Sequence, residues 1–125
     1  MSKEAVVATD SEMTHTLSTY VLDTALGRPA RAMDVTLERM NDDGVTTIGG
    51  GTTNADGRIA SLATSAMLTP GTYRLRFDTE GYFTASGRDT FYPEVAIHFR
   101  IGTSAEHYHV PLHVSPFGYW TSRER

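Results

Sequence analysis

Short segments in which apolar and polar residues alternate dominate this sequence, and they limit the folds open to the chain. Residues 33–38 alternate between the two types, and the pattern returns in residues 73–78 and 95–101. Because successive side chains of a strand point to opposite faces, each segment predicts a strand with one buried and one solvent-facing side. Glu38 falls on the solvent-facing side of the first segment. Repeated segments of this kind are typical of an all-β fold.

Turn sequences rich in glycine, proline, asparagine and aspartate separate these segments. They lie at residues 27–30, 41–44, 54–57 and 69–72. Three consecutive glycines at residues 49–51, inside a β-rich segment, predict a bulge or a close approach of two backbones. Residues 79–87 hold the one short helix that the pattern allows. We therefore expect an all-β sandwich of roughly seven or eight strands with one short helix.

Length and composition indicate one domain. A chain of 125 residues builds a single hydrophobic core, and we expect a flexible tail over residues 1–14 and one domain over residues 15–125. The net charge of −4, without a basic block, argues against nucleic-acid binding. No apolar run reaches the roughly 20 residues that span a membrane, and none near the start has signal-peptide length. With no cysteines, the expected location is the cytoplasm.

The last nineteen residues carry many of the side chains that can move protons. If this segment begins with a strand, His107, His109, Pro111 and His113 share one face, and the apolar residues between them face the core. Three interpretations of the histidine face remain open. The histidines are solvated surface residues, or His107 and His109 bind a metal with Glu124, or an imidazole transfers protons near neutral pH.

Several segments resemble the family of transthyretin-like 5-hydroxyisourate hydrolases. Residues 107–112 and 115–119 resemble the motif near the family's C-terminus, and residues 17–30 resemble its first strand and turn. Shorter matches lie at residues 53–58, 71–73 and 91–95. The resemblance implies a transthyretin-like sandwich that forms a homotetramer, a dimer of dimers, with a channel lined by the first strand and the last two. It implies no cofactor and no metal.

In the hydrolases this channel is the active site, which opens the ring of 5-hydroxyisourate, an early product of urate oxidation. Arg58 matches the arginine after the family's Asp-Gly turn, and His109 matches the histidine of its penultimate strand. Tyr20 stands where the family has a histidine in the first strand. Ser122 and Glu124 stand where the terminal motif has tyrosine and glycine. Two groups of the family's site are thus kept and others are changed.

Further departures fall on the same face. His113 and Trp120 stand where the family leads us to expect leucine and serine, and Leu22 belongs to the first-strand face that lines the channel. Trp120 either stacks on a flat ligand or packs between subunits. Glu124 either orients His113 or belongs to a solvated terminus. We take Trp120, Ser122, Glu124 and Leu22 as candidate substrate-binding residues.

The departures lead to a hypothesis of altered specificity for a small-molecule substrate. Its main form is acid/base chemistry, most simply hydrolytic ring opening, on a heterocycle or carbonyl compound other than 5-hydroxyisourate. The candidate catalytic residues are His109 and His113 for proton transfer, Arg58 for the developing oxyanion, and Tyr20 for a hydrogen bond to the substrate. One alternative is a non-catalytic protein that binds a flat aromatic ligand. The other is a hydrolase that still acts on 5-hydroxyisourate.

Overall fold

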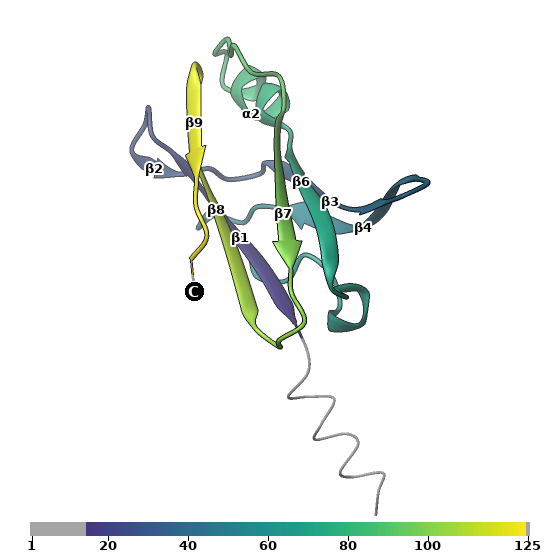
Figure 1. Ribbon diagram of the computed structural model, residues 1–125. Helices are drawn as coiled ribbons and strands as arrows, with labels where there is room; N and C mark the ends of the chain where they lie inside the picture. Colours follow the sequence, from purple (N-terminus) through teal and green to yellow (C-terminus); the bar gives the residue numbers. More distant parts are fainter. Residues whose placement is uncertain (1–14, 125) are drawn as a thin grey trace, which may run out of the picture.

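The computed structural model describes residues 15–124, and the expected tail at residues 1–14 lies outside them. Nine strands, a short α-helix and one 3₁₀ turn at Ser65–Met67 make up the described chain (Figure 1). The strands are β1 (Thr16–Asp23), β2 (Arg28–Pro29), β3 (Asp34–Asn41), β4 (Gly44–Thr52), β5 (Arg58–Ile59), β6 (Gly71–Phe77), β7 (Val95–Ile101), β8 (His107–Ser115) and β9 (Gly118–Thr121). The helix is α2 (Thr79–Ala85). The count exceeds the expected seven or eight because two of the strands, β2 and β5, have only two residues each.

The strands form two sheets that make a sandwich. One sheet has the order β2-β1-β8-β9, with β5 also paired to β1, and the other has the order β4-β3-β6-β7. All pairings are antiparallel except that of β1 with β8, which is parallel. Figure 1 shows α2 at one end of the sandwich, between the end of β6 and the start of β7. The predicted all-β sandwich with one short helix is confirmed.

The core lies between the two sheets and follows the alternation of the sequence. In β1, Leu17 and Val21 are buried, whereas Tyr20 and Leu22 on the opposite face are half-buried. In β8, the apolar residues between the histidines are all buried. The sheet with β6 contributes its large buried residues from the same alternation, including Phe77. The outer face of the β1–β8 pair therefore keeps its polar side chains outside the core.

Glu38 was expected on a solvated face and is instead buried, with 5% of its surface exposed. Its carboxylate accepts a hydrogen bond from Arg74 at 2.7 Å and another from Arg76 at 3.0 Å, both on the neighbouring strand β6. The two arginines cover the carboxylate, and their long stems shield it from water while their charges compensate it. Alternation gave the correct face of the sheet, but not the degree of burial.

The segment with glycines at residues 49–51 shows both a bulge and a close approach of two backbones. The register of β3 and β4 shifts between Leu37 and Glu38, which marks a bulge. A Cβ on Gly49 would lie 2.0 Å from the carbonyl oxygen of Leu62, and one on Gly50 would lie 2.3 Å from that of Val35. Any larger residue would push these backbones apart, so glycine is required here for steric reasons.

The end of β1 is tied to α2 by a buried carboxylate. Asp23 has no exposed surface, and it accepts hydrogen bonds from the Tyr82 hydroxyl at 2.8 Å, Arg88 at 2.8 Å and the Leu26 backbone N–H at 3.0 Å. Burial raises the pKa of Asp23, but the hydrogen bonds from Arg88 and Tyr82 outweigh it and hold the pKa below its ordinary value. These contacts fix the loop after β1 against the helix.

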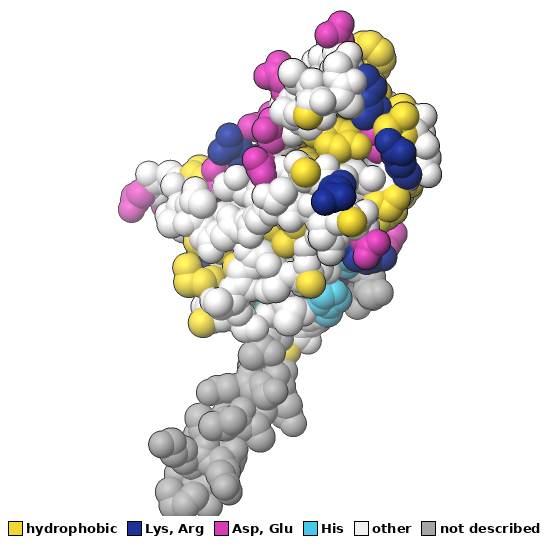
Figure 2. All heavy atoms as spheres, turned by 180° about the vertical axis from the view of Figure 1, so that it is seen from behind, with side chains coloured by type: hydrophobic (Ala, Val, Ile, Leu, Met, Phe, Trp, Pro, Cys, Tyr) yellow, Lys and Arg dark blue, Asp and Glu magenta, His cyan; other side chains and the backbone are white. Residues whose placement is uncertain are grey.

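The surface shows no separation of charge in the view that Figure 2 gives of the described residues, since carboxylates and arginines are intermixed there. Among these residues, no helix is both long and apolar enough to cross a lipid bilayer.

Candidate functional site

The candidate site lies on the outer face of the sheet that contains β1 and β8. Parallel pairing places Ser18 beside His109, Tyr20 beside Pro111 and Leu22 beside His113. The strand β5 pairs with the other edge of β1 and sets Arg58 opposite Tyr20. Because β1 lies between β5 and β8, one face carries side chains from three parts of the chain that are far apart in sequence.

His109 is half-buried and held by its neighbours on this face. The Ser18 hydroxyl lies 2.8 Å from Nδ1 of His109, and the same hydroxyl lies 3.2 Å from Nε2 of His107. The two imidazole rings stack with their centroids 6.5 Å apart. This arrangement fixes the orientation of the His109 ring, and the hydrogen bond at Nδ1 leaves Nε2 available for a proton transfer.

Burial and charge together favour the neutral form of His109. Its pKa lies below the ordinary value, chiefly because burial penalises the imidazolium, and the positive charges of Arg58 and His107 act in the same direction. The carboxylate of Glu124 opposes them and raises the pKa. An imidazole kept neutral at pH 7 can act as a general base.

Arg58 and Tyr20 form the second part of the face. The guanidinium carbon of Arg58 lies 4.9 Å from the centroid of the Tyr20 ring, in the geometry of a cation–π contact. Arg58 itself is exposed, and its turn begins at Asn54, whose side-chain oxygen accepts hydrogen bonds from the backbone N–H groups of Asp56 and Arg58. The turn thus places Arg58, which has no ion-pair partner among the described residues, next to the Tyr20 ring and near enough to lower the pKa of His109.

Glu124 is held next to His109 by a hydrogen bond between their backbones. Its N–H donates to the carbonyl oxygen of His109 at 3.1 Å, in an isolated bridge beyond the end of β9. Its side chain is exposed, and its charge is felt at the His109 ring. The structure therefore brings together four of the residues selected from the sequence, namely His109, Arg58, Tyr20 and Glu124.

His113, Trp120 and Leu22 form a neighbouring group further along the sheet. The rings of His113 and Trp120 meet edge to face with centroids 4.3 Å apart, and Leu22 is the β1 partner of His113. Nδ1 of His113 is buried and has no hydrogen-bond partner among the described residues. Pro111 is the β8 residue that pairs with Tyr20, and His109 and His113 each lie two positions from it, about 7 Å along the strand. Both histidines therefore flank Tyr20 on one face.

Ser122 lies apart from both groups. It is exposed and lines a hollow on the edge of the sandwich together with Tyr108, Val110 and residues of β7. The next residue, Arg123, turns to the same edge, where it binds Glu106 at 2.5 Å and covers the Tyr108 ring. The role of Ser122 in binding a substrate stays a prediction.

Two residues of the face were not selected from the sequence as site residues. Ser18, which holds the His109 ring, shares the alternation of Tyr20 and Leu22, and that pattern was the available signal. His107 was considered only as a member of the histidine face and was not chosen as a candidate site residue, yet its ring stacks on His109. Within residues 15–124, no group of three or more histidines, aspartates or glutamates is arranged to hold a metal ion.

A half-buried imidazole whose pKa is lowered, beside an exposed cation and a phenol, is suited to general acid/base chemistry on a polar small molecule. Comparison with known proteins identifies the family. A model of the HIUase/Transthyretin family matches residues 17–124. The 5-hydroxyisourate hydrolase of Salmonella dublin is 44% identical over 107 residues, which are 86% of this chain and 79% of that protein.

Solved structures give the same result. The structure of Klebsiella pneumoniae 5-hydroxyisourate hydrolase has a TM-score of 0.78 at 36% identity, covering 88% of this chain and 99% of that chain. Sea bream transthyretin in complex with thyroxine has a TM-score of 0.83 at 32% identity, covering 87% of this chain and 94% of that chain. The family model's match to residues 17–124 includes every residue of the candidate site. This chain belongs to the HIUase/transthyretin family.

Proposed function

We propose that this protein hydrolyses 5-hydroxyisourate by opening its ring. The observation that carries the proposal is the grouping of Arg58, Tyr20 and His109 on one face, with His109 held neutral. The relatives that bear the name 5-hydroxyisourate hydrolase support the same reaction. They favour it over the changed substrate that was the main hypothesis from the sequence.

The reaction begins with His109. Its Nε2 accepts a proton from water as the water oxygen bonds to a ring carbonyl carbon of the substrate. The carbonyl oxygen gains negative charge, which the Arg58 guanidinium stabilises because it is a fixed cation without a carboxylate partner among the described residues. The carbon–nitrogen bond of the ring then breaks, and the leaving nitrogen takes the proton from the His109 imidazolium. Atoms and charge balance, and His109 returns to its neutral form.

Tyr20 takes the place of an imidazole and has a different role. A phenol hydroxyl can donate a hydrogen bond to a substrate. Tyr20 therefore orients the substrate, while its ring positions Arg58 through the cation–π contact. Ser18 is a positioning residue, because it acts on the substrate only through the His109 ring.

The test is hydrolysis of freshly generated 5-hydroxyisourate, followed by ultraviolet absorbance against the spontaneous reaction. We expect acceleration by the wild type and a loss of about 10²–10⁴-fold in His109→Ala, the usual contribution of a positioned general base. Arg58→Ala should also be strongly impaired. His98→Ala is the matched control, because His98 is exposed on β7 in the other sheet. A folded wild type without acceleration, or His109→Ala at the wild-type rate, would refute the proposal.

His113→Ala decides whether a second imidazole takes part. If His113 shares the proton transfer, its removal lowers kcat. An unchanged kcat would limit His113 and Trp120 to shaping the site.

A second candidate function rests on the group formed by His113 and Trp120. They line a hollow of about 460 Å³ together with Thr24, Ser115 and Tyr119, and a flat aromatic ligand could stack on the half-exposed indole. The likeness to a transthyretin solved with thyroxine supports this alternative. Quenching of Trp120 fluorescence by a planar aromatic compound, without turnover of 5-hydroxyisourate, would favour binding over catalysis.

We further propose that the protein forms a homotetramer, a dimer of dimers, in which the outer faces of the β1–β8 sheets oppose each other. The exposed aromatic residues Phe117, Tyr119 and Trp120 around β9 support association at this sheet. Light scattering coupled to size-exclusion chromatography gives the mass directly. A monomeric mass at micromolar concentration would refute the assembly.

A further inference from the structure

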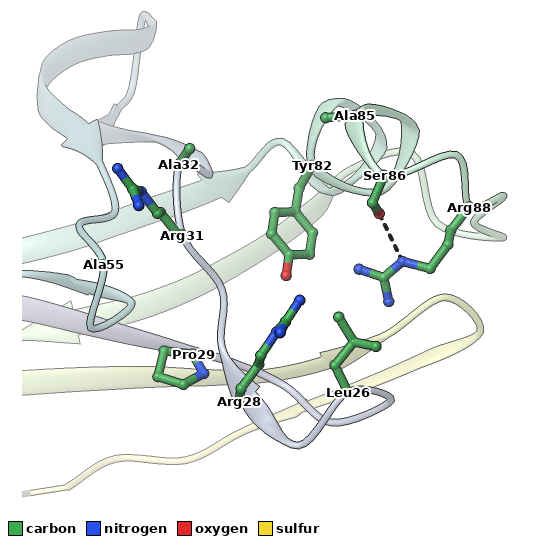
Figure 3. Close-up of a pocket in the computed structure, with 10 residues that line it drawn as sticks. All are labelled: Leu26, Arg28, Pro29, Arg31, Ala32, Ala55, Tyr82, Ala85, Ser86 and Arg88. Atoms are coloured by element: carbon green, nitrogen blue, oxygen red, sulfur yellow. Dashed lines mark hydrogen bonds between the residues drawn. The ribbon is translucent and has the colours of Figure 1, made fainter.

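A pocket of about 450 Å³ lies at the end of the sandwich near α2, apart from the candidate site. Its walls come from the loop after β1, the segment from β2 to β3, the turn at Ala55 and the end of α2 (Figure 3). None of the residues assigned to the candidate site lines it.

Three arginines line this pocket, which we call the arginine pocket: Arg28, Arg31 and Arg88. Figure 3 shows the Arg28 side chain extending into the space below Tyr82, while Arg31 stands at the edge and points outward. Like charges at close range repel each other, and a protein of net charge −4 has no general need to gather cations at one place. Arg28 and Arg31 are exposed and hydrated, and a bound anion would be attracted by both charges.

The charges of the arginine pocket are only partly neutralised by the protein. Arg88 donates to Asp23 at 2.8 Å and to the Ser86 hydroxyl at 2.8 Å, so it is fixed in place and its charge is balanced. Nη1 of Arg88 is nevertheless buried without an acceptor among the described residues. Arg28 and Arg31 make no ion pair or hydrogen bond through their side chains within residues 15–124. Two uncompensated positive charges therefore remain.

The remaining lining is largely apolar. Leu26 is exposed to 47%, and the side chains of Pro29, Ala32, Ala55 and Ala85 complete this part of the pocket. The Tyr82 hydroxyl is already committed to Asp23. A ligand thus meets arginine side chains interspersed with apolar ones, a combination suited to a short apolar body with an anionic head group.

We propose that the arginine pocket binds a small organic oxyanion, a phosphate monoester or a carboxylate with a short apolar part. The head group pairs with the Arg28 guanidinium, which offers the planar fork that both oxyanions accept bidentately. Arg31 at the rim adds attraction, and the apolar part covers Leu26 and the alanines. This site is independent of the proposed hydrolysis, because it shares no residue with the face that carries His109.

The proposal is tested by titrating the ¹⁵N-labelled protein with phenyl phosphate, benzoate and inorganic phosphate while amide chemical shifts are recorded. We expect saturable shifts at Leu26, Ala85 and Ser86 with phenyl phosphate or benzoate, and the tighter of the two identifies the head group. Arg28→Gln should weaken binding by at least about tenfold, the contribution of one charge-assisted hydrogen bond. Arg88 is left unchanged because it holds Asp23.

Arg100→Gln is the matched control. It makes the same charge change on an exposed arginine at the far end of β7 from α2. Its binding should equal that of the wild type. The proposal would be overturned if none of the three probes produced saturable amide shifts. It would also be overturned if Arg28→Gln and the wild type bound the probe with equal affinity. Inorganic phosphate binding as tightly as phenyl phosphate would overturn the role given to the apolar wall.

Discussion

Replacing Asp23 by alanine removes the acceptor that joins β1 to α2, and the structure allows the cost to be worked out. Asp23 is fully buried, and the Arg88 side chain that pairs with it is 23% exposed. Breaking a buried ion pair on one side costs about 3–5 kcal/mol, and the partial exposure of Arg88 places this one near about 3 kcal/mol. The Tyr82 hydroxyl loses its partner as well, which adds about 1 kcal/mol. We expect Asp23→Ala to lose about 4 kcal/mol in total, a large part of the stability of a small domain.

Urea denaturation at fixed protein concentration measures this loss as a shift of the midpoint with an unchanged m-value. Asp23→Asn keeps an acceptor oxygen and loses only the charge, so its cost should be about 2 kcal/mol. Asp42→Ala, in the exposed loop between β3 and β4, is the control and should stay within about 0.5 kcal/mol of the wild type. If Asp23→Ala also stays within that range, the carboxylate does not hold the helix and the reasoning is wrong.

The remaining predictions concern protonation and backbone geometry. Stability should fall below about pH 4, because Asp23 and Glu38 both have pKa values below their ordinary ones in the folded state. The stability that these carboxylates contribute is present above their unfolded pKa and is lost as the pH falls through their folded pKa. Thermal melts recorded at a series of pH values will measure this loss. The value of kcat/KM should rise with pH through an apparent pKa below about 6.5 and then level off, because His109 must be neutral to act as a base. Glu124→Gln should move that apparent pKa further down, since the carboxylate raises it; an unchanged pH profile would contradict the electrostatic role of Glu124. Gly57→Ala should destabilise the domain and lower activity, because φ at Gly57 is +75° and a Cβ would lie 2.5 Å from a carbonyl oxygen of β1. A mutant with the wild-type urea midpoint and the wild-type rate would contradict this close approach of Gly57 to the β1 backbone.

The fold was predictable from the sequence because a strand has a side-chain period of two. In β1 the alternation of Leu17 and Val21 with Tyr20 follows that period, and the structure buries the first two and leaves Tyr20 half-buried on the opposite face. The predicted helix at residues 79–87 ends slightly earlier, at Ala85. The two-residue strands β2 and β5 were not predicted, because two residues are too few to show a period and only their pairing to β1 defines them.

Buried charges were not predictable in the same way. Glu38 is covered by Arg74, which is 36 positions away in the sequence, and Asp23 is bound by Arg88, which is 65 positions away. A local pattern carries no information about such partners, so alternation placed Glu38 on a solvent-facing side and gave no sign that Asp23 is buried. His15 likewise matched no pattern, yet it is buried with its Nε2 3.0 Å from the carbonyl oxygen of Gly102.

The candidate site was predicted through the family resemblance rather than through the pattern. Alternation placed His109 and His113 on one face, but it could not choose between a solvated, a metal-binding and a catalytic role. It also could not set Arg58 opposite Tyr20, because that register depends on β5 meeting β1 after a turn of the chain. The roles of Leu22 and Ser122 remain predictions that substitution will decide.

The parallel pairing of β1 with β8 also determines when the site comes into existence. Their partnered residues are 91 positions apart, as in the contact of Ser18 with His109. Closing so long a stretch of chain costs entropy before its contacts compensate, and sandwiches rich in such pairings fold over about milliseconds to seconds. Recovery of enzymatic activity during refolding should therefore trail the formation of the local hairpin of β3 and β4. The recovered rate of hydrolysis during refolding would therefore measure the pairing of β1 with β8.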